Sequence, residues 1–441
     1  MKLYSIRMRR KVLLGITLFV CAIMSKGFVD ALFVNDNANG VLNLLKYFFL
    51  IGASFAFYAS NRSKKKKFSK EFRILMCFYL FVAFISVFSI IESGRFTFRT
   101  IKEFCFILTP IVFTYYAINA LNKDEITMMA KFSVVIYVVS YFMEISGNFS
   151  ISMAINAIKN FSLLGGQASF AYDYYETSHF PDPMMALFCY FCYYKKNNRK
   201  WAWISYISIL VMNKRLIILF ATIILILSYL PNWEKITSIK VNKKICIICA
   251  IVFAISPLVV IKLITSPLGI WFSNKTGLNM ADFWMGRDNM VLYYLNNHFQ
   301  SYGLGSTYDF TGSMLEIESV KIYLETTIVG SVLLSISYWK ITNRNLFSML
   351  VMLYIFLNIN TSTSLTTGAF AWIYYLFLIA INICGEMISS SCLMFIFSFI
   401  FNVDKIFLDT ILKTNQIYYL IGLISAVLSV FLVIKYIESI S

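Results

Sequence analysis

The chain has 441 residues, of which 59% are apolar and only 14% are charged, whereas a soluble domain is about 45–50% apolar and about 25% charged. This composition argues against a cytosolic enzyme, a disordered chain and a secreted disulfide scaffold. The net charge of +17 would suggest nucleic-acid binding in a soluble protein, but in so apolar a chain it more often reflects membrane topology.

Hydropathy predicts about fourteen membrane-spanning helices, because a span needs roughly 20 mostly apolar residues. The basic N-terminus precedes an apolar run without a small-residue cleavage site, so this run is expected to be the first span and not a signal peptide. The sequence therefore predicts an all-α polytopic membrane protein of about 12–14 transmembrane helices, with residues 1–441 as a single domain. The spans, several of them short, are expected at 12–33, 41–59, 74–91, 103–121, 132–146, 182–194, 201–212, 216–230, 245–264, 319–339, 346–357, 368–383, 391–402 and 417–434.

The positions of the basic residues predict the orientation of these spans. If the N-terminus lies inside and the spans alternate, well over half of the 39 lysines and arginines fall in inside segments, including the lysine run 64–67. Cytoplasmic loops carry such an excess, so both termini are predicted to be cytoplasmic. The two long outer loops are then about 147–181 and 265–318, and the basic excess gives no reason to expect a nucleic-acid partner.

The cysteines and histidines argue against a metal or redox centre. Two cysteine pairs, beginning at Cys189 and Cys246, have CxxC spacing, but both lie in predicted spans without a nearby histidine or carboxylate. A zinc site requires four ligands, and free cysteines commonly pack as small apolar residues. The chain has only two histidines, so no metal site and no cofactor are predicted.

Arginines on the predicted outer face suggest an anionic ligand, because the planar guanidinium group suits phosphate oxygens. The apolar stretch 201–230 would form a helix of ~45 Å, which is too long for one upright span of about 30 Å, so a break is expected at Asn213, Lys214 and Arg215. Lys214 and Arg215 would then lie where a lipid diphosphate sits; a loop anchor that snorkels to the interface is the alternative. The four arginines predicted at or near the outer face are Arg95, Arg99, Arg215 and Arg287.

The second outer loop has the densest set of candidate site residues. Arg287 could clamp a diphosphate, and the turn at Gly303 and Gly305 allows a backbone to approach a ligand closely. A general base for a sugar hydroxyl would come from this loop or its exit. A solvated loop residue is the alternative for the histidine, and a solvated helix start is the alternative for the two glutamates. The candidate bases are His298, Glu316 and Glu318.

Two further groups of polar residues flank these candidates. Lys321 and Glu325 lie four residues apart at the start of a predicted span, which favours a structural ion pair. The first outer loop combines acids, aromatic residues and a histidine, a mixture common where sugars bind, although aromatic residues at an interface also form simple membrane belts. Asp173, Glu176 and His179 are therefore predicted to contact a sugar substrate.

Taken together, residues of about 175–340 resemble the O-antigen polymerase and ligase superfamily of bacterial envelope glycosyltransferases. This family has a Ser-Arg-like pair between two short spans, an Asn/Asp-Pro turn before a span, and a large outer loop with an arginine followed by a Gly-x-Gly turn. Its loop-exit helix typically carries Glu-x-Gly-x-x-Gly. In this chain Thr327 replaces the first of those glycines, and Glu316 and Ile317 stand where ligases commonly have a histidine and an asparagine, which favours a polymerase. The matching segments are Asn213 to Arg215, Phe180 to Pro183, Gly286 to Gly305 and Glu316 to Gly330.

The resemblance implies a helical bundle related to the C-type glycosyltransferases in the bacterial inner membrane. The partners it implies are a polyprenyl-diphosphate-linked oligosaccharide donor, a lipid-linked acceptor, the lipid bilayer and a chain-length regulator protein. Arg215 and Arg287, with Lys214, would hold the donor diphosphate and neutralise the departing group, and Glu318 or His298 would take the acceptor proton.

Two alternative functions stay open on the sequence. The first is the ligase of the same superfamily, which transfers a finished glycan to lipid A core and shares the donor chemistry. The second is a flippase for lipid-linked oligosaccharide, which also has about twelve to fourteen spans but needs ionisable residues lining a central cavity. The polar residues of this chain gather in two outer loops, which favours an enzyme over a flippase.

Overall fold

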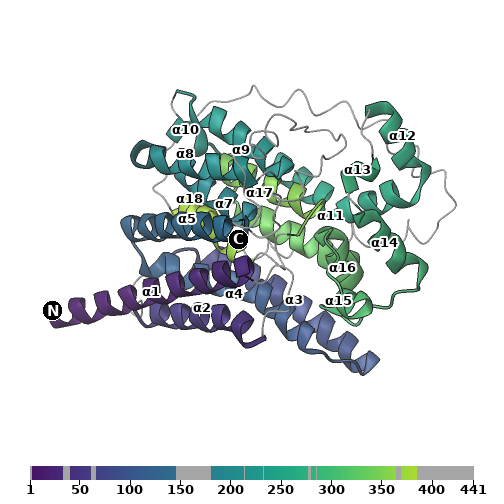
Figure 1. Cartoon of the computed structure of the whole chain (residues 1–441), viewed down its shortest axis with the longest axis horizontal. Helices are drawn as coiled ribbons and strands as arrows, with labels where there is room; N and C mark the ends of the chain where they lie inside the picture. Colours follow the sequence, from purple (N-terminus) through teal and green to yellow (C-terminus); the bar gives the residue numbers. More distant parts are fainter. Residues whose placement is uncertain are drawn as a thin grey trace.

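The protein is an all-α polytopic membrane protein. The computed structural model describes residues 2–32, 40–60, 66–145, 180–212, 214–231, 233–276, 280–284, 286–363 and 369–384. Six of its helices are long and apolar enough to cross a membrane, and four shorter helices are also apolar. Figure 1 shows the arrangement.

Each of the first twelve predicted spans corresponds to one helix, although α1 begins well before its predicted start. The predicted spans 391–402 and 417–434 lie outside the described residues. The helices are α1 (Lys2–Leu32), α2 (Gly40–Ser60), α3 (Ser69–Ser93), α4 (Phe98–Ala120), α5 (Lys123–Ile145), α7 (Pro181–Tyr193), α8 (Lys195–Met212), α9 (Arg215–Ser228), α10 (Trp233–Thr237), α11 (Lys243–Thr265), α12 (Pro267–Thr276), α13 (Met280–Trp284), α14 (Arg287–Asn296), α15 (Ser306–Thr311), α16 (Glu318–Ile341), α17 (Leu346–Ile359) and α18 (Ala369–Cys384).

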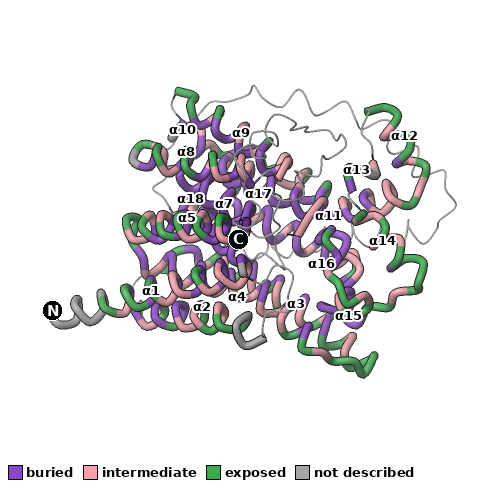
Figure 2. The backbone as a smooth tube through the Cα atoms, in the orientation of Figure 1, coloured by how far each residue is buried: buried purple, intermediate pink, exposed green. Residues whose placement is uncertain are grey.

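The short helix α7 lies in the centre of the bundle. Pro181 occupies its first turn, where the missing N–H of proline costs no helical hydrogen bond. Every residue from Phe180 to Cys192 is buried, and α7 packs against α8, α9 and α18. Figure 2 shows this central region as buried. A helix that is apolar on all sides is expected in such a position.

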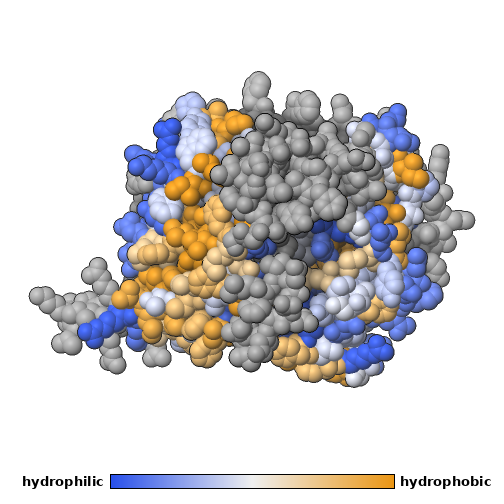
Figure 3. Space-filling view, in the orientation of Figure 1, coloured by the Kyte–Doolittle hydropathy of each residue, from blue (hydrophilic) through white to orange (hydrophobic). Residues whose placement is uncertain are grey.

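The outer surface of the bundle is apolar where a bilayer would contact it. Large side chains such as Phe48, Phe55, Phe84 and Ile91 are more than half exposed on α2 and α3. Figure 3 shows hydrophobic residues over the part of the surface formed by α2 and α5, and hydrophilic residues around α12 and α14. Soluble proteins rarely expose contiguous apolar surface of this kind, and lipid accounts for it.

The predicted break between two short spans is present. The indole N–H of Trp203 donates to the Tyr229 hydroxyl at 2.9 Å, and the Tyr206 hydroxyl is 3.0 Å from that of Thr222. The earlier residue of α8 contacts the later residue of the α9 segment, and the later contacts the earlier. The two helices therefore run antiparallel and form a hairpin. Its turn lies at Lys214, whose backbone is extended.

The second of the two predicted outer loops, residues 265–318, is a folded unit in its described part and not an extended connection. Helices α12 to α15 gather at the end of the molecule opposite the N-terminus (Figure 1). A separate apolar cluster holds α13 and α14 against the start of α16, and it includes Trp284, Val291, Tyr294, Ile317 and Val320. The polar residues of this loop are therefore carried on a packed scaffold.

Helix α16 is interrupted at Thr327, whose backbone has φ 62° and ψ −176°. This region is essentially restricted to glycine. The break separates a first section, which carries Glu318, Lys321 and Glu325, from the longer apolar section.

Thr327→Gly is expected to stabilise the protein by about 1 kcal/mol, because the removed backbone strain of about 1–3 kcal/mol exceeds the entropy cost of glycine. Thermal unfolding in detergent should show a higher midpoint. The control is Thr326→Gly, since Thr326 is buried with its hydroxyl bonded to the Ile322 carbonyl at 2.7 Å, and this change should lower the midpoint. A lower midpoint for both variants would contradict the strain argument.

Candidate functional site

The first turns of α4, α7 and α16, at the helix ends predicted to face outside, bury several charged side chains. Ionisable groups inside a membrane protein are costly and usually mark a function or a specific partner. All of these side chains lie within about two turns of a predicted outer helix end. They are Arg99, Glu103, Asp182, Glu318, Lys321 and Glu325, and none is more than 9% exposed.

The first group of contacts, the Asp182 cluster, joins α7, α9 and α17. Lys214 Nζ lies 2.9 Å from Asp182 Oδ2. The Tyr354 hydroxyl and the Asn358 amide donate to Asp182 Oδ1 at 3.0 and 2.8 Å, and the Tyr375 hydroxyl donates to the Asp182 carbonyl at 3.2 Å. Because Asp182 also sits in the first turn of α7, its charge faces the positive end of the helix dipole.

Arg215 is the first residue of α9 and is half-buried. Within the described part of the chain, no ion pair involves its guanidinium group. The first turn of a helix also presents unbonded backbone N–H groups, which favour anions. Arg215 therefore offers a positive charge to a ligand, beside a lysine that Asp182 holds in place.

The backbone of Glu318 is linked to the Asp182 cluster through the residues that follow α17. The carbonyl of Asn358 accepts hydrogen bonds from the backbone N–H groups of Thr361 and Ser362, at 3.0 and 2.7 Å. The Ser362 carbonyl in turn accepts from the Glu318 backbone N–H at 3.4 Å. The end of α17 thus links the start of α16 to Asn358, whose side chain bonds to Asp182.

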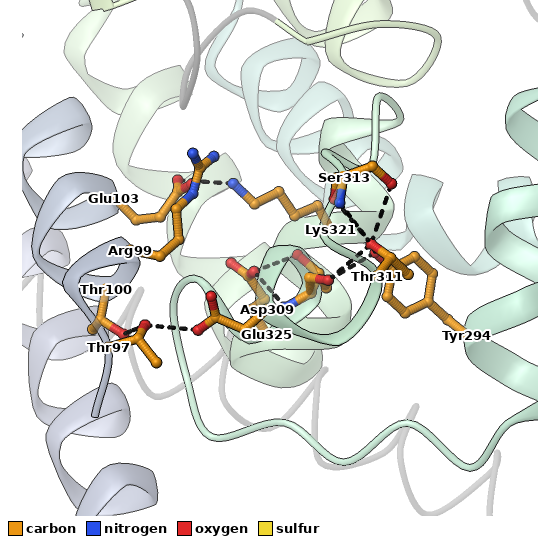
Figure 4. A network of polar contacts seen from close by, with 11 residues as sticks. Thr97, Arg99, Thr100, Glu103, Tyr294, Asp309, Thr311, Ser313, Lys321 and Glu325 are labelled. Atoms are coloured by element: carbon orange, nitrogen blue, oxygen red, sulfur yellow. Dashed lines mark hydrogen bonds and ion pairs between the residues drawn. The ribbon is translucent and has the colours of Figure 1, made fainter. Parts of the chain in front are cut away.

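The second group of contacts, the Glu103 cluster, joins α4 to α16 (Figure 4). Glu103 Oε1 lies 2.6 Å from Arg99 Nη2, and Glu103 Oε2 accepts from Lys321 Nζ at 2.8 Å. The Arg99 guanidinium also lies over the Tyr308 ring, 4.1 Å from its centroid, a favourable cation–π arrangement. The fully buried carboxylate of Glu103 therefore forms ion pairs with two buried cations, Arg99 and Lys321.

Glu325 fixes the turn before α15 to the first section of α16. Its Oε1 accepts from the Thr307 backbone N–H at 3.2 Å and from the Thr307 hydroxyl at 2.5 Å. Ser301 Oγ donates to the Glu325 carbonyl at 2.9 Å. Lys321 therefore pairs with Glu103 on α4, and Glu325 bonds to Thr307 in α15.

Asp309 connects the outer loop to the start of α4. Thr97 Oγ1 donates to Asp309 Oδ2 at 2.6 Å, and the Tyr302 hydroxyl donates to the same oxygen. Burial, together with this carboxylate, raises the pKa of the Tyr302 phenol. Tyr302 therefore stays protonated at physiological pH and acts as a donor.

The structure brings together some of the predicted site residues. Arg287 Nε lies 2.6 Å from Glu316 Oε2 in a partly exposed ion pair, and His298 is exposed with φ 50°. Gly303 and Gly305 approach other helices of the same chain, α3 at Ser86 and α4 at Arg99 and Thr100. The predicted sugar-contacting residues Asp173, Glu176 and His179 lie outside the described residues.

Gly303→Ala is expected to destabilise the protein by about 3 kcal/mol. Its φ of +98° disfavours any side chain, and a Cβ there would lie 2.6 Å from the Ser86 Cα atom, so backbone strain and a steric clash add. Gly312→Ala is the control, because Gly312 has φ +70° and open space around it, and it should cost about 1 kcal/mol. Equal losses in thermal unfolding midpoint would show that the contact with α3 contributes nothing.

Sequence reasoning missed the acceptors of these clusters. Glu103 lies four residues after Arg99, a spacing that predicts a pair on one helix face, and this signal was present in the sequence. Tyr354 and Asn358 have the same spacing on α17, but nothing in the sequence connects them to Asp182. Among the described residues, no group of three or more His, Cys, Asp and Glu side chains could hold a metal ion.

No protein-family model, curated protein or solved structure matches this chain.

Proposed function

We propose that the protein is a membrane glycosyltransferase that polymerises polyprenyl-diphosphate-linked oligosaccharide repeat units into O-antigen or a related surface polysaccharide. It would act at the outer face of the bacterial inner membrane, with both termini in the cytoplasm. The observation that carries the proposal is Arg215, a half-buried cation without an ion pair in the described residues. It stands beside Lys214 at a helix N-terminus, where a lipid diphosphate would lie.

In this reaction the acceptor hydroxyl oxygen bonds to the anomeric carbon of the donor sugar. The bond from that carbon to the diphosphate oxygen breaks, and polyprenyl diphosphate leaves with the electron pair. Arg215 would stabilise the charge that develops on this leaving group. Arg287 would join it by exchanging Glu316 for a phosphate oxygen, since the Arg287–Glu316 pair is partly exposed.

Glu318 is the best placed of the three candidate bases. Glu316 and His298 are exposed to solvent, whereas Glu318 is buried. Glu318 is the buried first residue of α16, and its backbone N–H bonds to the Ser362 carbonyl after the end of α17. Its carboxylate would accept the proton of the acceptor hydroxyl as the new bond forms.

The break in α16 gives independent support to the resemblance on which this proposal draws. Thr327 adopts a backbone conformation that favours glycine, at the position where the family pattern has glycine. The interrupted helix turns its charged first section toward α4 and the outer loop. A chain-length regulator and a second lipid-linked repeat unit are the further partners that the proposal implies.

Gene deletion in the native strain, followed by gel analysis of the envelope glycolipid, tests the proposal. Loss of a polymerase should leave core that carries a single repeat unit. Bare core would instead indicate the ligase or flippase activity, and an unchanged long ladder would contradict any role in assembly of this glycan. Re-expression of the wild-type gene should restore the ladder.

A further inference from the structure

Three lysine side chains gather where α2 packs against α1 and α4, at helix ends predicted to face outside. Each ammonium group lies near an aromatic ring, which is a favourable cation–π position. The rings also contact one another, because the centroid of the Tyr47 ring is 5.8 Å from one of the other two and 6.4 Å from the second. The distances from ammonium nitrogen to ring centroid are 5.8 Å for Lys26 and Phe370, 5.6 Å for Lys46 and Tyr47, and 5.6 Å for Lys102 and Phe106.

The lysine cluster, which consists of Lys26, Lys46 and Lys102, is one electrostatic group. The charge of Lys46 lies within interaction range of both other lysines. Like charges that approach one another in partly apolar surroundings repel strongly, because little water screens them. Negative charge placed close to the cluster would relieve this repulsion.

The acids near the lysine cluster are already paired with other cations. Asp30 lies within interaction range of Lys46, and Glu103 lies within range of Lys102. Asp30, however, forms an ion pair with the third lysine of the cluster, and Glu103 is shared by the two cations described above. Glu144 on α5 lies within range of the ion pair that Asp30 forms. Among the described residues, neither Lys46 nor Lys102 has an ion pair of its own.

The two unpaired ammonium groups are open to a ligand. Lys46 and Lys102 are half-buried. Neither ammonium group donates a hydrogen bond to a described residue, and neither nitrogen is closed to solvent. Lysine binds phosphate oxygens as a compact charge with three N–H donors. We propose that Lys46 and Lys102 form a second anion site, separate from Arg215, which binds a phosphate group.

Two sources bring a phosphate group to this place. One is inorganic phosphate in the solution at the predicted outer face. The other is the headgroup of an anionic phospholipid, whose acyl chains would contact exposed apolar side chains of the same helices. Phe48 on α2 is 73% exposed, and Phe98 on α4 is 65% exposed. Neither source depends on the proposed glycosyl transfer.

Thermal unfolding of the full-length protein in a maltoside detergent tests the site, with inorganic phosphate and phosphatidylglycerol as the two anionic probes. A ligand that binds only the folded state raises the unfolding midpoint in a saturable way. At least one of the two probes should do so, whereas phosphatidylcholine with the same acyl chains and sodium chloride at matched ionic strength should not. A shift from inorganic phosphate identifies the free anion as a ligand, and a shift from phosphatidylglycerol alone identifies the lipid headgroup.

Lys46→Gln and Lys102→Gln each remove one charge of the site, so either variant gives the measurement if the other does not fold. Each should weaken the apparent affinity for the active probe about 5-fold, as expected for one lysine beside an anionic headgroup. Without the probe, the midpoint should stay the same or rise, because each change relieves repulsion and breaks no ion pair. Lys275→Gln is the matched control, since Lys275 is an exposed lysine of α12 in the second predicted outer loop, and this variant should bind as the wild type does.

The absence of a saturable shift with either anionic probe would overturn the inference. Unchanged affinity in both lysine variants of the site, or an equal loss of affinity in Lys275→Gln, would overturn it as well. These binding measurements need no catalysis. A deletion strain that contradicts the polymerase would therefore leave the phosphate site standing, and failed binding would leave the polymerase proposal standing.

Discussion

Glu103→Gln is expected to lower the free energy of unfolding by about 3–5 kcal/mol, the usual cost of removing one partner from a buried ion pair. Glu103 is fully buried and is the carboxylate that Arg99 and Lys321 share. Glutamine keeps the shape of the side chain but removes its charge, which leaves two desolvated cations close together. Thermal unfolding in detergent, with folded protein followed by size-exclusion chromatography, measures the loss.

Two variants make this result specific to the buried network. Glu316→Gln removes the same charge from a pair of similar length, but Glu316 is half exposed, so its cost should be at most about 1 kcal/mol. Lys321→Met removes one cation and leaves the Arg99–Glu103 pair intact, so it should cost less than Glu103→Gln. If Glu103→Gln and Glu316→Gln both left the unfolding midpoint unchanged, the buried network would contribute nothing to stability.

Arg215→Ala is expected to reduce polymer formation at least about 100-fold at unchanged protein level. Removing one group that stabilises developing charge typically costs two to three orders of magnitude in rate. Arg215 has no ion pair among the described residues, so its loss should leave the folded state nearly unaffected. The polysaccharide ladder on a gel and the midpoint of thermal unfolding give the two readouts.

The controls for this prediction separate charge from geometry. Arg215→Lys keeps the charge but loses the planar fork that binds two oxygens at once, so it should retain only part of the activity. Arg95→Ala removes an exposed arginine from the same predicted outer face and should leave the ladder intact. A full ladder from Arg215→Ala would contradict the diphosphate-binding role.

Local sequence was sufficient for the membrane architecture. The twelve spans that fall on described residues all correspond to helices, because a span depends on the summed hydropathy of neighbouring residues. The hairpin of α8 and α9 was predictable for a similar reason: the apolar stretch exceeds the thickness of a bilayer and is broken by two basic residues.

The partners of those basic residues were not predictable. Lys321 and Glu103 are 218 residues apart, and Asn358 and Asp182 are 176 residues apart. Lys321 had a closer candidate in Glu325, four residues away, and sequence spacing alone favoured that pair. The packing of α4 against the outer loop and α16 brought Glu103 to Lys321 and turned Glu325 toward Thr307.

The sequence by itself determined the class of the protein, the positions of most spans and the cationic character of the predicted outer face, since each follows from composition within a window of about 20 residues. Only the tertiary structure decided which cations are neutralised by buried carboxylates and which stay available to a ligand. Charge pairing depends on how distant helices pack, and no single segment of the sequence determines that packing.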